Sequence, residues 1–170
     1  MAQYVIKTKL GDFLAGFRDG RLVELALPKT WSASKRPPAL ADQEGAAGRK
    51  LLGELREYLA GRRTRFTVPM APEGTAWQRR VWQAMRSIPW GQTRTYGEIA
   101  RAVGAPGAAR AVGAACGANP VLIVNPCHRI VASNGLGGFG RKARRLDLKK
   151  MLLGLEAGSN HKGTKTQRGH

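Results

Sequence analysis

Cys127 and His128 are the residues whose types and spacing best support chemistry in this chain. They directly follow Pro126, and His128 is the only histidine outside the last ten residues. A cysteine thiolate is the best protein nucleophile near neutral pH, and a neighbouring imidazole is the usual means of generating one. The pair therefore predicts an activated thiol. The alternative is a buried, inert cysteine beside a hydrogen-bonded histidine.

The activation of Cys127 depends on the local backbone. Adjacent side chains on a strand point to opposite sides, so His128 can act on Cys127 only if the chain turns here or a water molecule bridges them. A carboxylate that orients the imidazole would complete a Cys-His-acid relay. Glu98 and Glu156 are both candidates, and the sequence does not choose between them. A thiol protease or a Cys-x-x-Cys redox protein fits the spacing poorly.

The cysteine count predicts no metal site. Cys116, Cys127 and His128 are the only Cys and His residues in the body of the chain, and a structural zinc site needs about four ligands. We expect both thiols to be free, because their settings differ and the chain shows no export signal.

The charge predicts a polyanionic partner. The 170 residues include 29 Lys and Arg against 11 Asp and Glu, which gives a net charge of +18 and a pI of about 11.2. Nucleic acid is the first candidate, and a solvated basic surface is the alternative. No apolar run is long enough to span a membrane, so we expect a cytoplasmic protein.

Residues 1–72 are predicted to form a scaffold domain. The apolar pattern predicts an antiparallel meander, a helix and one further short strand; the ranges are 4–10, 13–17 and 22–27 for the meander, 45–60 for the helix and 66–69 for the strand. Residues 28–43 are expected to form a loop.

Residues 73–157 carry the residues that could do chemistry. Thr75 can cap a helix whose Trp77 and Trp82 fit core packing better than base stacking. Thr95 and Glu98 form a capping box before a helix over 96–103, and a second helix of small residues follows over 108–118. This pair predicts a helix-turn-helix, with a helical hairpin packed in the core as the alternative.

The end of the chain completes the predicted second domain. Residues 121–124 are expected to form a buried strand. It leads into the turn at Pro126-Cys127-His128, called the cysteine turn below, and residues 130–132 are expected to form a short extended piece. A last amphipathic helix is predicted over 143–156. The polar segment 158–170 is predicted to be disordered.

Five stretches together resemble the O6-alkylguanine-DNA alkyltransferases, over about residues 74–157. The stretches are Ile88-Pro89-Trp90-Gly91, Thr95-Tyr96-Gly97-Glu98-Ile99-Ala100, Ala109-Arg110-Ala111-Val112-Gly113, Asn119-Pro120 and Pro126-Cys127-His128-Arg129-Ile130. The resemblance implies a mixed α/β (α+β) fold, with a ribonuclease-H-like N-terminal sheet and helix and a mostly helical C-terminal domain. Asn125 stands where that family usually has an aliphatic residue.

The resemblance also implies roles for individual residues. Cys127 would accept the alkyl group, His128 would act as base through a water molecule, and Glu156 would orient His128. Asn119 would brace the cysteine turn, which Arg129 would also support, and Tyr96 would help rotate the nucleotide and hydrogen-bond the guanine. The implied DNA contacts are Arg110, Tyr96, Ala111, Gly113, Cys116 and Arg129. The implied substrate pocket is Ile130, Leu122, Gly138 and Phe139.

The implied reaction is irreversible, single-turnover repair. The Cys127 thiolate would attack the alkyl carbon of O6-alkylguanine in a nucleotide flipped out of duplex DNA, with O4-alkylthymine as a weaker candidate substrate. The protein would act as a monomer bound in the minor groove, without cofactor or metal. The alternatives are a non-catalytic sensor of alkylated DNA and a thiol hydrolase.

Overall fold

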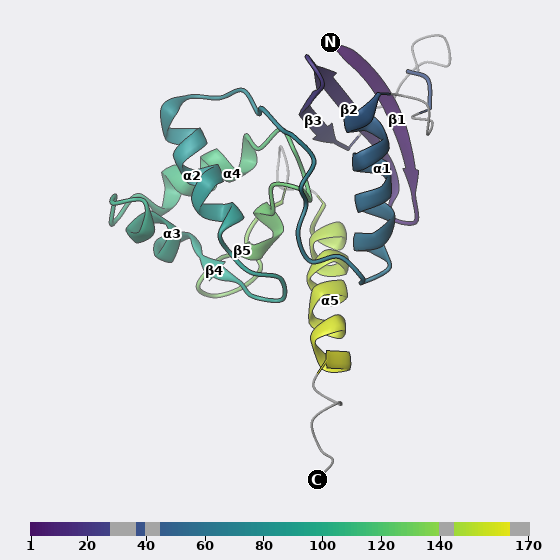
Figure 1. Cartoon of the computed structure of the whole chain (residues 1–170). Coiled ribbons are helices and arrows are strands. Elements are labelled where there is room, and N and C mark those ends of the chain that lie inside the picture. Colours follow the sequence, from purple (N-terminus) through teal and green to yellow (C-terminus); the bar gives the residue numbers. More distant parts are fainter. Residues whose placement is uncertain (28–36, 40–44, 140–144, 164–170) are drawn as a thin grey trace. The chain divides into compact units, whose positions relative to one another are not determined.

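The computed structural model describes residues 1–27, 37–39, 45–139 and 145–163, and side chains as far as residue 158. The chain divides into two compact units, which are described separately (Figure 1). Unit 1 comprises Met1–Thr75 and Pro120–Asn125, and unit 2 comprises Ala76–Asn119 and Pro126–His170. The division of function between two domains stays a prediction. No helix among the described residues is long and apolar enough to cross a membrane.

Unit 1 is built on the predicted antiparallel meander. Strands β1 (Ala2–Thr8), β2 (Gly11–Arg18) and β3 (Arg21–Ala26) pair in the order β1-β2-β3. Asp19 and Gly20 both have positive φ, of 50° and 70°, which suits a tight turn whose twist matches that of the paired strands. The expected meander is thus confirmed, with strand ends shifted by one or two residues.

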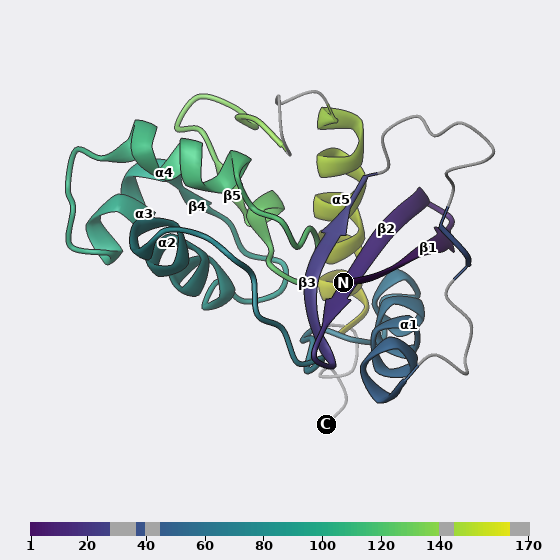
Figure 2. The ribbon, with the colours of Figure 1, turned by 90° about the horizontal axis from the view of Figure 1, so that it is seen from above.

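Helix α1 (Ala46–Leu59) lies along one face of this sheet (Figures 1 and 2). Within its apolar stripe, Leu51, Leu55 and Tyr58 are at most 2% exposed. The three side chains recur at helical spacing, so one face of α1 is buried as predicted. The predicted loop 28–43 lies largely outside the described residues.

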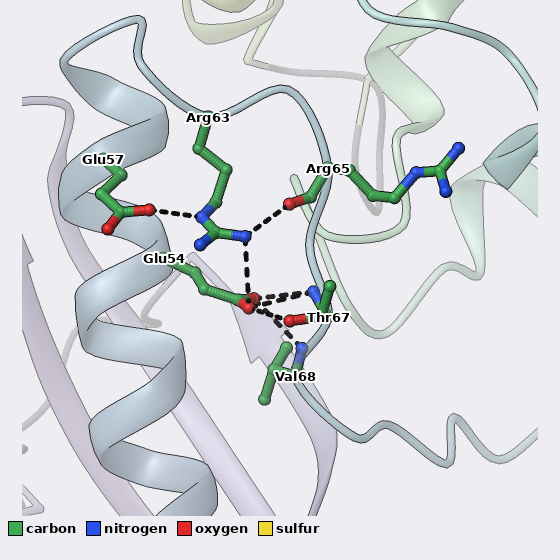
Figure 3. Close-up of polar contacts among 6 residues, drawn as sticks. All are labelled: Glu54, Glu57, Arg63, Arg65, Thr67 and Val68. Atoms are coloured by element: carbon green, nitrogen blue, oxygen red, sulfur yellow. Dashed lines mark hydrogen bonds and ion pairs between the residues drawn. The ribbon is translucent and has the colours of Figure 1, made fainter.

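A buried carboxylate fixes the segment that follows α1. Glu54 is 3% exposed and accepts the backbone N–H groups of Thr67 at 2.9 Å and Val68 at 3.1 Å, as well as the Thr67 hydroxyl (Figure 3). Arg63 lies 3.5 Å from the same carboxylate. The prediction of a strand over 66–69 is wrong, because Glu54 takes the N–H groups that a strand partner would need. Only Met70 forms a β-bridge here, with β3.

The predicted strand over 121–124 is also wrong. Val121 makes one bridge to Leu25 of β3, and the chain then turns, with the Asn125 N–H bonding the Val121 carbonyl at 3.0 Å. Ile123 has φ of 69°, a strained value for a β-branched residue. The apolar run is buried as expected, but it curls instead of extending because its pairing with β3 stops after one bridge.

Unit 2 begins with three packed helices. They are α2 (Ala76–Arg86), α3 (Tyr96–Ala102) and α4 (Ala109–Gly117). Thr95 accepts the Glu98 N–H and Glu98 accepts the Thr95 N–H, so the predicted capping box is confirmed. Gly104 follows the last residues of α3, and its φ of 75° turns the chain away from the helix. Helices α3 and α4 thus form the predicted helix-turn-helix.

The cysteine turn and the last helix complete unit 2. Strand β4 (Arg94–Thr95) pairs in parallel with β5 (Ile130–Val131), which directly follows a 3₁₀ turn over Cys127–Arg129. Helix α5 spans Leu146–Gly163 and so differs from the predicted 143–156 at both ends. Residues 158–163 are helical, whereas the sequence predicted disorder from 158, and residues 164–170 lie outside the described residues.

Candidate active site

Cys127 begins a 3₁₀ turn, so the chain bends where the chemistry requires it to bend. Pro126 precedes the turn, and the Arg129 N–H bonds the Pro126 carbonyl at 3.0 Å. With three residues per turn, successive side chains lie about 120° apart and no longer point to opposite sides as on a strand. Cys127 is 4% exposed and free of a disulfide. The turn therefore allows His128 to act as a base toward the Cys127 thiol.

His128 is hydrogen-bonded to Glu156 and not to Glu98. The His128 Nε2 atom lies 2.7 Å from Glu156 Oε1, and the two side chains are 0% and 1% exposed. Glu98 is exposed and occupied by its capping box. The choice that residue types and spacing left open therefore goes to Glu156, on α5, as the family resemblance implied. Because Nε2 faces Glu156, a proton from Cys127 would have to reach His128 through Nδ1.

Arg129 binds both oxygens of the same carboxylate. Its Nε donates to Glu156 Oε2 at 2.9 Å, its Nη2 donates to Oε1 at 3.0 Å, and its Nη1 donates to the Ile88 carbonyl at 2.7 Å. The residue is 7% exposed. This geometry favours support of the cysteine turn over the DNA contact expected for Arg129, because the guanidinium is buried and engaged.

The electrostatics keep Glu156 ionised and His128 neutral. Burial alone would raise the pKa of Glu156, but the hydrogen bonds from His128 and Arg129 outweigh it and lower the pKa to about 2. Burial lowers the pKa of His128, although Glu156 opposes that effect. A neutral imidazole beside an ionised carboxylate can accept a proton at neutral pH.

Tyr96, at the first position of α3, contacts the glycine-rich loop 135–138, which follows the cysteine turn and β5. Its hydroxyl accepts the Gly138 N–H at 3.3 Å. A Cβ atom at Gly137, where φ is 68°, would lie 2.7 Å from that hydroxyl, so only glycine fits there. Burial raises the pKa of Tyr96, which remains a hydrogen-bond donor at neutral pH. The structure thus joins Tyr96 to the loop that carries two of the expected pocket residues, Gly138 and Phe139.

The expected DNA-contact residues of α4 divide into two groups. Arg110 and Ala111 are exposed, and Gly113 lies against the Tyr96 ring. Cys116, by contrast, is 7% exposed, and burial raises the pKa of its thiol to about 12. This geometry favours a packing role over a DNA contact for Cys116. Asn119, expected to brace the cysteine turn, is 6% exposed, and its N–H bonds the Cys116 carbonyl at 3.1 Å.

The expected pocket residues are at least partly buried. Ile130 is 0% exposed, Phe139 is 3% exposed, and Gly138 is half-buried, all in unit 2. Leu122 is 4% exposed and belongs to the segment that clusters with unit 1.

Lys149 is a site residue that the sequence analysis missed. Its side chain is 0% exposed, and its ammonium group donates to the carbonyl groups of Ile130, Leu136 and Gly138. Burial lowers the pKa of Lys149, and the negative charge of a cysteine thiolate, at Cys127 first and Cys116 second, opposes that effect when the thiol is ionised. One buried cation therefore hydrogen-bonds both β5 and the loop that contacts Tyr96.

The spacing of α5 carried a signal for Lys149. Lys149, Leu152 and Glu156 lie at i, i+3 and i+7, which places them on one helix face, and Leu152 is fully buried. A lysine on a buried stripe is rare unless its charge is satisfied, so the pattern marks it for attention. No cluster of three or more His, Cys, Asp or Glu that could hold a metal occurs in the described parts of the chain.

These observations define a class of protein. A cysteine in a rigid turn, a buried His-Glu-Arg network and a helix-turn-helix in the same unit are the parts of a thiol-bearing DNA-binding protein.

Comparison with known proteins identifies the family within this class. Residues 76–158 match the DNA-binding domain of 6-O-methylguanine DNA methyltransferases. The inducible methylated-DNA–protein-cysteine methyltransferase of Bacillus subtilis is 40% identical over 152 residues, which cover 86% of this chain and 83% of the relative. The methylated-DNA–protein-cysteine methyltransferase of Methanosarcina mazei is 38% identical over 157 residues, which cover 92% and 97%.

The solved structures agree. The crystal structure of Mycobacterium tuberculosis OGT in complex with DNA superposes with a TM-score of 0.79 at 38% identity and covers 94% of both chains. The chain belongs to the methylated-DNA–protein-cysteine methyltransferase family.

Proposed function

We propose that this protein repairs alkylated DNA by direct reversal, moving the alkyl group of O6-alkylguanine to Cys127 in a single, irreversible reaction. The observation that carries the proposal is the 2.7 Å hydrogen bond between His128 and Glu156, directly after a buried cysteine. It joins residues 28 positions apart into the relay that a nucleophilic thiol needs. The names of the relatives support the same substrate class.

The chemistry balances without a cofactor. A neutral His128 accepts the Cys127 proton, through a bridging water molecule and Nδ1, and ionised Glu156 stabilises the resulting imidazolium. The thiolate attacks the alkyl carbon in an SN2 step. The S–C bond forms as the C–O6 bond breaks, and the electron pair leaves on O6 of the guanine, which takes up a proton. The thioether product is a poor leaving group, so each molecule reacts once.

DNA is the partner that the charge and the helix-turn-helix support. We place α4 in the minor groove, with Arg110 in the gap left by the flipped nucleotide and Tyr96 beside the rotated base. Flipping is required because a thiolate cannot reach an O6 substituent in line while the guanine stays stacked. We further infer that one monomer acts on each lesion and that it does so in the cytoplasm, in contact with the genome.

Transfer of label tests the proposal directly. The protein is mixed with a duplex that carries O6-methylguanine with a radiolabelled methyl group, and the protein is then digested and mapped. We expect one label per molecule, on the peptide that contains Cys127, and none in Cys127→Ala. Label absent from the wild-type protein, or retained by Cys127→Ala, would contradict the proposal.

The same assay addresses the sensor alternative. A protein that binds the lesion tightly but takes up no label would be a sensor. The intact Cys127 and its engaged His128 give that alternative no support.

A further inference from the structure

Trp77, in the first turn of α2, makes two contacts that core packing does not require. Its indole Nε1–H donates to the Ala111 carbonyl at 3.2 Å. Its ring also lies under the guanidinium carbon of Arg80, which is 5.3 Å from the ring centroid. Trp77 is only half-buried, whereas Trp82 is 2% exposed. One indole therefore connects Arg80 with α4.

These contacts matter because α4 has few large side chains and no N-terminal cap to fix its position. It consists of alanine, glycine, valine and cysteine apart from Arg110, and no side chain caps its N-terminus. Trp82 donates its indole N–H to the Ala115 carbonyl at 2.8 Å, one turn beyond Ala111. Two indoles on α2 thus hold two successive turns of α4, and the first of them contacts the residue next to Arg110.

Arg80 has the properties of a phosphate ligand. Its side chain is exposed, and within the described part of the chain no carboxylate forms an ion pair with it. A guanidinium presents a planar fork of donors that matches a phosphate group. Stacking on Trp77 restricts the side chain before DNA arrives, so less entropy is lost on binding. Arg110 and Ala111 are exposed on the helix to which Trp77 is bonded.

We propose that Arg80 binds a backbone phosphate beside the nucleotide displaced by Arg110, and that Trp77 is the positioning residue that holds Arg80 there. The proposal rests on the proposed function, because it places α4 against DNA. It adds a contact from α2, outside the helix-turn-helix, to the DNA-binding surface.

The salt dependence of binding tests this contact. The affinity for a short duplex carrying O6-methylguanine is measured by fluorescence anisotropy over a series of KCl concentrations, in a Cys127→Ala background that does not consume the lesion. Each phosphate contact contributes about 0.9 to the slope of log K against log salt. We expect Arg80→Gln to reduce the slope by about that amount. Arg86→Gln is the matched control and should keep the wild-type slope, because Arg86 is exposed on the same helix and makes no ring or ion-pair contact with the described residues.

A second substitution separates the contact from its positioning. Trp77→Leu removes the ring and should reduce the slope as Arg80→Gln does, and the double variant should lose no more than either single variant. A wild-type slope in Arg80→Gln, or an equal loss in Arg86→Gln, would overturn the phosphate contact. A loss in Arg80→Gln but not in Trp77→Leu would overturn the positioning role alone.

A different measurement, the transfer of label to Cys127, tests the proposed function. If wild-type protein takes up no label at Cys127 while Arg80→Gln still lowers the salt slope, the repair reaction is wrong and the phosphate contact stands. Thermal unfolding of each variant shows whether the fold is kept, and Arg80→Gln, at an exposed position, decides the contact even if Trp77→Leu does not fold.

Discussion

At the scale of single residues, two buried charges on α5 organise the site in different ways. Glu156 accepts hydrogen bonds from His128 and Arg129, and so it orients the base of the reaction. Lys149 donates to three carbonyl groups and so fixes the loop whose Gly138 N–H bonds the Tyr96 hydroxyl. Both charges are inaccessible to solvent, so each depends on its partners for compensation.

Replacement of Lys149 should slow the reaction even without DNA. Lys149→Met leaves the buried Ile130 carbonyl and the partly buried Leu136 and Gly138 carbonyls without their donor, at a cost of roughly 1–3 kcal/mol for each group that is buried and finds no other partner. It also removes a positive charge near the Cys127 thiolate. We expect the rate with free O6-benzylguanine to fall by roughly tenfold or more, because small displacements in a site have large effects on rate.

The adjacent lysine provides the control for this prediction. Lys150 is exposed, and Lys150→Met should change stability by no more than about 0.5 kcal/mol and leave the rate unchanged. A Lys149→Met protein that is less stable but reacts at the wild-type rate would show that Lys149 supports only the fold.

Glu156 should make stability depend on pH in the acid range. Its pKa is about 2 in the folded protein against an ordinary value of 4.5, so its contribution is complete above pH 4.5 and is lost as the pH falls toward 2. The difference corresponds to about 3 kcal/mol. Urea unfolding at several pH values should show this loss in the wild-type protein, and Glu156→Gln should show a shallower dependence. Equal slopes in the two proteins would contradict the assignment.

At the scale of elements, α4 is made of small residues around one long side chain. Its surface carries Arg110, while Val112, Ala115 and Cys116 are buried. A smooth helix of this kind can approach another surface closely, which leaves Arg110 as the only side chain on it that can reach far into a groove.

Arg110→Ala should therefore separate the two substrates. Repair of a duplex requires flipping, which costs a few kcal/mol, while the reaction with free O6-benzylguanine does not. We expect the duplex rate to fall at least roughly tenfold more than the free-base rate, as measured by single-turnover kinetics. Arg101→Ala, exposed on α3, serves as the control. Equal losses on both substrates would count against insertion of Arg110.

The elements that local sequence determines were predictable. The Thr95–Glu98 capping box depends on neighbouring residues and is found as expected. The strand expected over 121–124 failed because its conformation depends on β3, almost a hundred positions earlier in the chain.

The candidate site was predictable in its residues but not in its arrangement. Cys127, His128 and a carboxylate were found by type and spacing, but the choice of Glu156 over Glu98 depends on where α5 packs. The engaged state of Arg129 and the burial of Lys149 also follow from tertiary packing, which no local pattern specifies.

At the scale of the whole molecule, the two units are interleaved along the chain. The segment Pro120–Asn125 belongs to unit 1, yet it connects Asn119 to Pro126, both of unit 2. Its pairing with Leu25 lies within unit 1 and directly precedes the cysteine turn. Residues 1–75 contribute no candidate catalytic side chain, but they supply the strand on which this segment rests.

A fragment that lacks residues 1–75 should therefore lose solubility and activity. Residues 76–170 alone would expose the apolar residues 121–124, which are at most 7% exposed in the whole chain. We expect this fragment to aggregate and to react slowly with O6-benzylguanine, and a co-expressed fragment of residues 1–75 to restore both properties. Full activity of the isolated fragment would show that residues 1–75 are dispensable.

Helix α5 has a consequence for the genetics of this protein. The reacting cysteine is translated well before the ribosome reaches Glu156, 28 residues after His128. A nonsense or frameshift mutation between codons 130 and 149 would leave the Pro126-Cys127-His128-Arg129 motif intact in the gene while removing both buried charges that organise it, Lys149 and Glu156. In a screen for loss of resistance to alkylating agents, such alleles should behave as complete nulls. A search by motif alone would misread them as functional.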